Sequence, residues 1–224
     1  MGFVKENIDR IFKISIISGF LTVILYISFT LLSWALFPNP ATPFNHWLSD
    51  LGRFQVPADG SPVWDPETLE LFSGPSQYNP GAIWYNLGCI FTGISLFPFF
   101  LGFLKLKEEE SKMNRRLISG TISVGFASAF ALIMIGIFFE DWGDIHHFWT
   151  ILFFILMLIV KILAGIITWR LDFKKAVPIY AWIIIIFDLI VIFTNNSFAI
   201  IEWISVFTGL ALVGIIAYNF RTIE

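Results

Sequence analysis

Six long apolar runs dominate this sequence of 224 residues and leave the chain few ways to fold. A helix needs about 20 mostly apolar residues to cross the hydrocarbon core of a membrane, and the runs have about that length. They cover residues 14–37, 82–104, 117–139, 146–169, 176–194 and 199–220. Because no run alternates apolar and polar residues as a barrel strand does, the spans are expected to be helices. The sequence therefore predicts an all-α membrane protein, a single domain over residues 1–224 with six transmembrane helices in one bundle.

The composition excludes a soluble domain. Hydrophobic residues make up 57% of the chain and charged residues only 14%. A soluble domain of this length keeps too much surface in water to hide so many apolar side chains. The single cysteine, Cys89, lies inside an apolar run, so the chain has neither a disulfide of its own nor a cysteine-based metal cluster.

Basic residues are distributed unevenly between the two sides of the predicted bundle. Of the 14 lysines and arginines, 12 lie before the first span, in the loops around 105–116 and 170–175, or after the last span. The loops on the other side hold only Arg53. Because basic loops face the cytoplasm, this asymmetry predicts a protein of the cell (plasma) membrane with both termini in the cytoplasm.

The segment 38–81 is the one long stretch outside the spans, and it holds eight of the ten prolines. Prolines restrict the backbone to extended or turn geometry and discourage long helices. We expect a Pro-rich extracytoplasmic cap between the first two helices, with short helices near residues 46–51 and 66–72. The acidic residues of this segment are Asp50, Asp59, Asp65, Glu67 and Glu70.

All three histidines map to the outward side of the predicted bundle. His46 precedes Ser49 and Asp50 just after the first span, and His146 and His147 open the fourth span. Two or three imidazoles, a carboxylate and an open position for water are what a catalytic zinc site needs. These four histidine and aspartate side chains are therefore candidate metal ligands, with zinc as the candidate cofactor. Ser49 or a metal-bound water is the candidate nucleophile toward a lipid ester or amide.

A structural interpretation explains the same region without chemistry. The other polar residues at this level are Asn86, Glu140, Asp144 and Glu202. Asp144 is placed to cap the fourth span, where its negative charge suits the helix N-terminus, and Asp50 is placed to pin a turn before Gly52. Asn86 is a candidate hydrogen-bond partner for Asp50 or Ser49. The sequence leaves open whether these side chains are ligands or caps.

Two charged residues fall deep inside predicted spans. Lys161 and Asp188 lie roughly 13 Å and roughly 18 Å from the cytoplasmic ends of their helices, at about 1.5 Å per residue. An unpaired charge at that depth costs several kcal/mol, so we expect the two side chains to form an ion pair. A structural ion pair is favoured over a proton or ion relay because no other polar residue aligns with it.

Three stretches carry a resemblance to a known family. They are "HWLSDLG" after the first span, "YNPGAIWYNLGCIFTG" entering the second, and "GIFFED" with "HHFW" around the loop before the fourth. They resemble a family of small prokaryotic, largely archaeal, six-span membrane proteins of unknown function. More distantly they are similar to the Frag/DRAM/Sfk group, whose members have a Ser-Asp pair followed by Gly after the first span. The resemblance implies a six-helix bundle with Ser49 and Asp50 on the extracytoplasmic side.

A looser likeness is to the ceramidase and progestin-receptor superfamily, whose members use Ser, Asp and three His around zinc. This chain differs in span number and lacks a His-x-x-x-His pair in a late span. The sequence predicts an integral membrane protein whose outward-facing pocket engages a lipid or another amphiphile. The alternatives are a zinc-dependent membrane hydrolase, a small transporter and a membrane-organising scaffold. A membrane lipid is the expected partner and nucleic acid is not, while the oligomeric state stays open.

Overall fold

The computed structural model describes residues 2–64, 72–107, 111–171, 173–194 and 198–223. Asp65, Glu67, Glu70 and nearly all of the helix predicted near 66–72 lie outside the described residues. Six helices in the described part are long and apolar enough to cross a membrane, and they pack together, which confirms the predicted fold class. They are α1 (Gly2–Leu36), α2 (Ala82–Leu101), α3 (Lys112–Ile137), α4 (Asp144–Arg170), α5 (Ala176–Thr194) and α6 (Ala199–Ile223).

The start of α1 and the end of α2 differ from the ends of the predicted spans. α1 begins twelve residues before the predicted start at residue 14, because no proline interrupts the charged stretch that precedes the apolar run. α2 ends at Leu101 and continues as a 3₁₀ helix, η2 (Gly102–Lys107). For α1, the charged residues before residue 14 therefore mark the edge of the apolar run and not the start of the helix.

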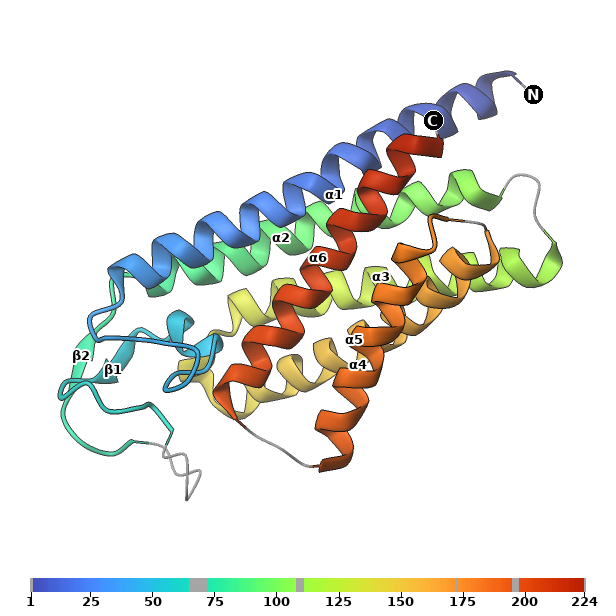
Figure 1. The fold of residues 1–224 in the computed structure, drawn as a ribbon. Coiled ribbons are helices and arrows are strands. Elements are labelled where there is room, and N and C mark those ends of the chain that lie inside the picture. The colour runs from blue at the N-terminus through green and yellow to red at the C-terminus, as the bar shows by residue number, and fades with distance from the viewer. Residues whose placement is uncertain (1, 65–71, 108–110, 172, 195–197, 224) are drawn as a thin grey trace.

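Helices that follow one another in the chain pack side by side from α1 to α5, and α6 returns to pack against α1 and α5 (Figure 1). Figure 1 places the N- and C-termini at the same end of the bundle. The described part of the α1–α2 connection, residues 37–64 and 72–81, lies at the opposite end, which we call the connection end. In this arrangement α5 packs against both α4 and α6.

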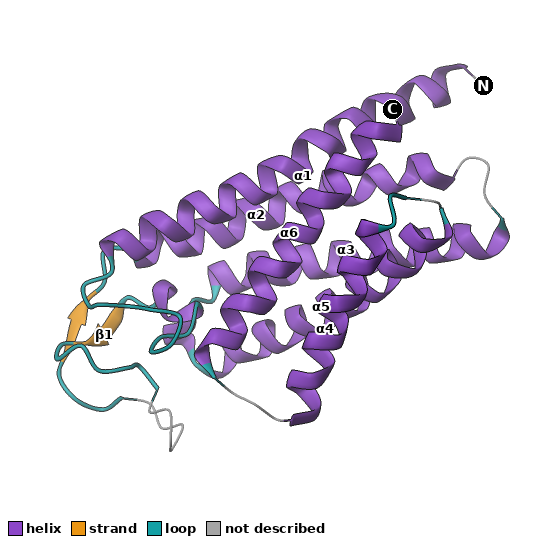
Figure 2. Ribbon diagram, viewed as in Figure 1, coloured by secondary structure: helices purple, strands orange, loops and turns teal. Residues whose placement is uncertain are grey.

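The α1–α2 connection is folded against the helix ends. It contains a 3₁₀ helix, η1 (Ser49–Gly52), and two short antiparallel strands, β1 (Gln55–Pro57) and β2 (Ser76–Tyr78) (Figure 2). Buried Asn79 holds it to the start of α2: its side-chain amide donates to the carbonyls of Leu51 and Arg53, at 3.1 and 2.8 Å. The short helix predicted near residues 46–51 is thus a 3₁₀ turn over Ser49–Gly52.

Candidate functional site

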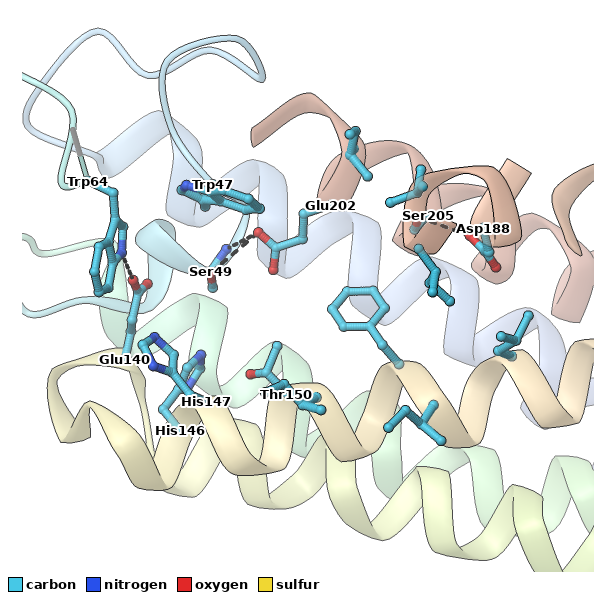
Figure 3. A pocket seen from close by; sticks show the side chains of 17 residues that line it. Trp47, Ser49, Trp64, Glu140, His146, His147, Thr150, Asp188, Glu202 and Ser205 are labelled. Carbon is cyan, nitrogen blue, oxygen red and sulfur yellow. Dashed lines mark hydrogen bonds between the residues drawn. The ribbon is translucent and has the colours of Figure 1, made fainter. Parts of the chain in front are cut away.

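A cavity of about 580 Å³ lies between α4, α5, α6 and the connection (Figure 3). Its lining is polar at the connection end and apolar further along the helices. The polar and aromatic lining residues at the connection end are Trp47, Ser49, Trp64, Glu140, His146, His147, Thr150 and Glu202. The apolar lining residues are Ile151, Phe154, Ile155, Leu158, Val191, Ile192 and Ile201, and Asp188 and Ser205 complete the wall.

Glu202 joins the first turn of α6 to the connection. Its Oε2 accepts hydrogen bonds from the backbone N–H groups of Leu48 and Ser49, at 2.7 and 3.3 Å, and from the Ser49 hydroxyl at 3.4 Å. The first N–H groups of a helix have no partner inside it, so a carboxylate at the start of η1 satisfies them. In Figure 3 one oxygen of Glu202 points toward Ser49 and the other toward the cavity. Trp203 strengthens the same junction by donating to the backbone oxygen of His46 at 3.0 Å.

Glu140 stands on the 3₁₀ helix η3 (Glu140–Trp142), between α3 and α4. Its Oε1 accepts a hydrogen bond from the Trp64 indole at 3.0 Å and lies 3.7 Å from the Arg53 guanidinium. The Trp64 ring packs 5.6 Å from the His147 ring. Glu140 therefore brings the connection and the start of α4 together at the wall of the cavity.

His46 and Asp50 lie behind this wall. Both are completely buried, and His46 Nδ1 is 3.3 Å from Asp50 Oδ2, which also accepts from the Trp47 backbone N–H at 2.9 Å. Burial lowers the pKa of the His46 imidazole and raises the pKa of the Asp50 carboxyl well above its ordinary value, with the Glu140 charge raising it further. Burial thus disfavours the charged form of both side chains.

A side-chain hydrogen bond to Glu140 is among the causes that raise the pKa of the Asp50 carboxyl. Two ionised carboxylates offer only acceptors, so this bond requires a proton on one of them. Asp50 Oδ1 and Glu140 Oε2 are both buried and have no donor from the rest of the described protein. A proton shared between the Asp50 carboxyl and Glu140 would satisfy both atoms.

Asp50→Asn tests this shared proton. The amide can donate to Glu140 as a protonated Asp50 carboxyl would, so we expect the variant to keep its stability to within about 1 kcal/mol, whereas Asp50→Ala loses about 2 kcal/mol.

The pH dependence of stability is a second test. Since the folded state binds the Asp50 proton more tightly than the unfolded chain, the stabilisation by this proton is complete below the ordinary pKa of 3.8 and is lost as the pH rises through the raised pKa. Thermal unfolding between about pH 4 and about pH 8 should show wild type losing stability relative to Asp50→Asn. A constant difference across that range would contradict the shared proton.

His146 is buried with its Nδ1 2.8 Å from the Phe138 backbone oxygen, and its Nε2 has no partner in the described protein. It does not meet His46 in a ligand set. Over the described ranges, no three histidine, cysteine, aspartate or glutamate side chains are grouped so that they could hold a metal ion. The zinc site therefore stays a prediction from residue types.

The other predicted residues divide between the cavity and its surroundings. Asn86 donates to the backbone oxygen of Gly52 at 2.9 Å, and not to the expected Asp50 or Ser49. Asp144 is exposed in the first turn of α4, where its charge faces the helix N-terminus without a side-chain capping bond.

Lys161 and Asp188 meet inside the bundle. Lys161 Nζ lies 2.7 Å from Asp188 Oδ2, and the Ser205 hydroxyl donates to Asp188 Oδ1 at 3.0 Å. The three residues link α4, α5 and α6 at the part of the cavity wall that Asp188 and Ser205 form. Sequence reasoning missed Ser205, although its spacing of three residues from Glu202 places both on one helix face.

Sequence reasoning also did not identify Trp47, Trp64 and Arg53 as site residues. The usable signal was that Arg53 is the only basic residue on the predicted outward side, where Glu140 and Asp141 need a counter-charge.

The fold and the cavity define a helical membrane protein with a buried polar cluster at one end of a mostly apolar cavity. The sequence matches the family described as "protein of unknown function (DUF998)" over residues 71–219, and the chain belongs to that family. The match includes Glu140, His146 and Glu202, whereas His46, Ser49 and Asp50 precede it. No curated protein and no solved structure matches the chain. The archaeal type and the distant similarity to the Frag/DRAM/Sfk group stay predictions.

Proposed function

We propose that this protein binds a membrane amphiphile in the cavity, with the polar head group at the connection end and the hydrocarbon chain along α4, α5 and α6. The observation that carries the proposal is the lining, which is polar at the connection end and mostly apolar along the helices, where Asp188 and Ser205 are the polar side chains among the described lining residues. A volume of about 580 Å³ is within the usual range for small-molecule sites.

The apolar side of the cavity also supports a lipid-like occupant. Ile151, Ile155 and Ile192 line it and are exposed to 60%, 52% and 59%. These side chains belong to helices that are apolar enough to cross a membrane. A hydrocarbon chain that packs against them therefore stays in an apolar environment, away from water. An ion or a sugar would gain nothing from the same surface, which makes the transporter alternative weaker.

Hydrolysis of a lipid ester or amide is the second candidate. The observation in its favour is the Ser49 hydroxyl, which lies 3.4 Å from the Glu202 carboxylate and lines the head-group end. Release of fatty acid from added lipid by the wild type, lost in Ser49→Ala, would support it. No release by either protein would leave binding as the function.

Native mass spectrometry of protein released from nonionic detergent tests the binding proposal. The wild type is expected to carry about one amphiphile per chain, and Ile155→Trp, which fills the apolar part of the cavity, should lower that occupancy about tenfold. Ile186→Trp is the matched control, because Ile186 is 55% exposed on α5 and does not line the cavity. Equal occupancy in the wild type and both variants would contradict the proposal.

A further inference from the structure

We propose that the amphiphile carries a cationic, ammonium-type head group, an inference that rests on the proposed binding function. Among the described residues that line the cavity are carboxylates but no lysine or arginine. Glu140 and Glu202 line the connection end, together with His146 and His147, and the Arg53 guanidinium lies 3.7 Å from Glu140 without lining the cavity. An anionic head group would meet two carboxylates, of which only Glu140 has a positive side chain close to it.

Glu202 is the carboxylate that lacks a counter-charge. Asp188 is paired with Lys161 at 2.7 Å, and Glu140 has the Arg53 guanidinium at 3.7 Å. Glu202, in contrast, receives only backbone and hydroxyl donors on Oε2, and within the described part of the chain no lysine, arginine or histidine forms an ion pair with it.

Burial makes this missing partner costly. The Glu202 residue is only 8% exposed, and its position in the first turn of α6 gives it no more than the partial positive charge of a helix terminus. A buried charge needs a partner to offset the loss of water around it. An ammonium group in the cavity would supply that partner to the oxygen that Figure 3 shows facing inward.

Aromatic rings complete the recognition of a cation. Trp47 and Trp64 line the same end of the cavity, and Figure 3 shows Trp64 beside Glu140 and Trp47 beside Glu202. Indole faces attract ammonium groups through their quadrupole and do so more strongly when water is excluded. The combination of two indoles and an uncompensated carboxylate selects a methylated or primary ammonium over a neutral or anionic head group.

A competition between three lipids with identical dioleoyl chains tests the head-group charge. The probes are dioleoyl-trimethylammonium-propane, dioleoylglycerol and dioleoyl-phosphatidylglycerol, offered in equal amounts to the full-length protein in nonionic detergent and counted by native mass spectrometry. We expect the cationic lipid to be bound about tenfold more than the anionic one. Glu202→Gln should remove most of that preference, and Asp59→Asn, which removes one exposed charge from the same connection, should keep it.

The remaining arms separate the sources of failure. Trp47→Leu should also reduce the preference for the cationic lipid, so the proposal can still be tested if Glu202→Gln does not fold. Tetramethylammonium at the same concentration should not compete, because it lacks the chain; competition by it would overturn the lipid as the source of the cation. Equal binding of all three lipids, blocked by Ile155→Trp, would overturn the cationic head group and leave the proposed function standing. Binding that Ile155→Trp does not change would overturn the proposed function itself.

Discussion

Replacing Lys161 by methionine is expected to lower the free energy of unfolding by about 3–5 kcal/mol, the largest effect of any single substitution considered for this protein. The side chain is 4% exposed and its ammonium lies 2.7 Å from Asp188 Oδ2. Removing it leaves Asp188 with only the Ser205 hydroxyl, in a place where lipid and packed helices supply no water. Unfolding of the detergent-solubilised protein, followed by tryptophan fluorescence, measures the loss.

Two further variants separate pairing from general damage. In Lys161→Met/Asp188→Leu both charges are absent, so most of the lost stability should return, because apolar residues of similar size replace a buried ion pair at little cost. Lys174→Met removes an exposed lysine that lies 5.4 Å from the Tyr218 ring, and it should cost less than about 1 kcal/mol. A Lys161→Met protein as stable as Lys174→Met would show that Asp188 does not depend on its partner.

Gly136→Ala is expected to destabilise the protein by about 1–3 kcal/mol, the second largest effect. A Cβ atom at Gly136 in α3 would collide with the backbone oxygen of Asn86 in α2 and would lie 2.8 Å from Ile90 Cγ1. Backbone cannot move aside as a side chain can, so the two helices must separate. Because Asn86 also holds Gly52 of η1, the separation would reach the connection as well. Thermal unfolding in detergent is the measurement.

Gly165→Ala is the control for this substitution. Its Cβ would lie 3.5 Å from Ala181 Cβ, an ordinary contact, and alanine favours a helix over glycine by about 1 kcal/mol. The control should therefore be neutral or stabilising. If Gly136→Ala behaved in the same way, the close approach of α2 and α3 would not be a constraint on the fold.

The helical membrane fold could be predicted from the sequence because lipid imposes a simple rule. Only helices long enough to cross the hydrocarbon core satisfy their own backbone groups, so apolar length alone predicts the six helices. The same rule indicated the contact between Lys161 and Asp188, because two buried opposite charges at similar depth have a strong reason to meet. These inferences depend on distance along a helix, which sequence gives directly.

The arrangement of the site could not be predicted in the same way. Ser49, Glu140, His146, His147 and Glu202 line one cavity as their common depth suggested, whereas His46 and Asp50 turn away from it. The cause is η1: as a 3₁₀ turn it directs Asp50 back toward His46 and the Trp47 N–H, inside the connection. The path of an irregular connection depends on contacts such as those of Asn79, which no periodic pattern reveals.

Photo-crosslinking tests the central claim most directly. A lipid with a trimethylammonium head group and a diazirine near the middle of one chain would be added to the purified protein, irradiated, and mapped by mass spectrometry of peptides. The account predicts labels concentrated on the apolar lining of α4, α5 and α6, around Ile155, Leu158 and Ile201, and their loss in Ile155→Trp. Labels spread evenly over the exposed faces of all six helices, unchanged in that variant, would contradict it.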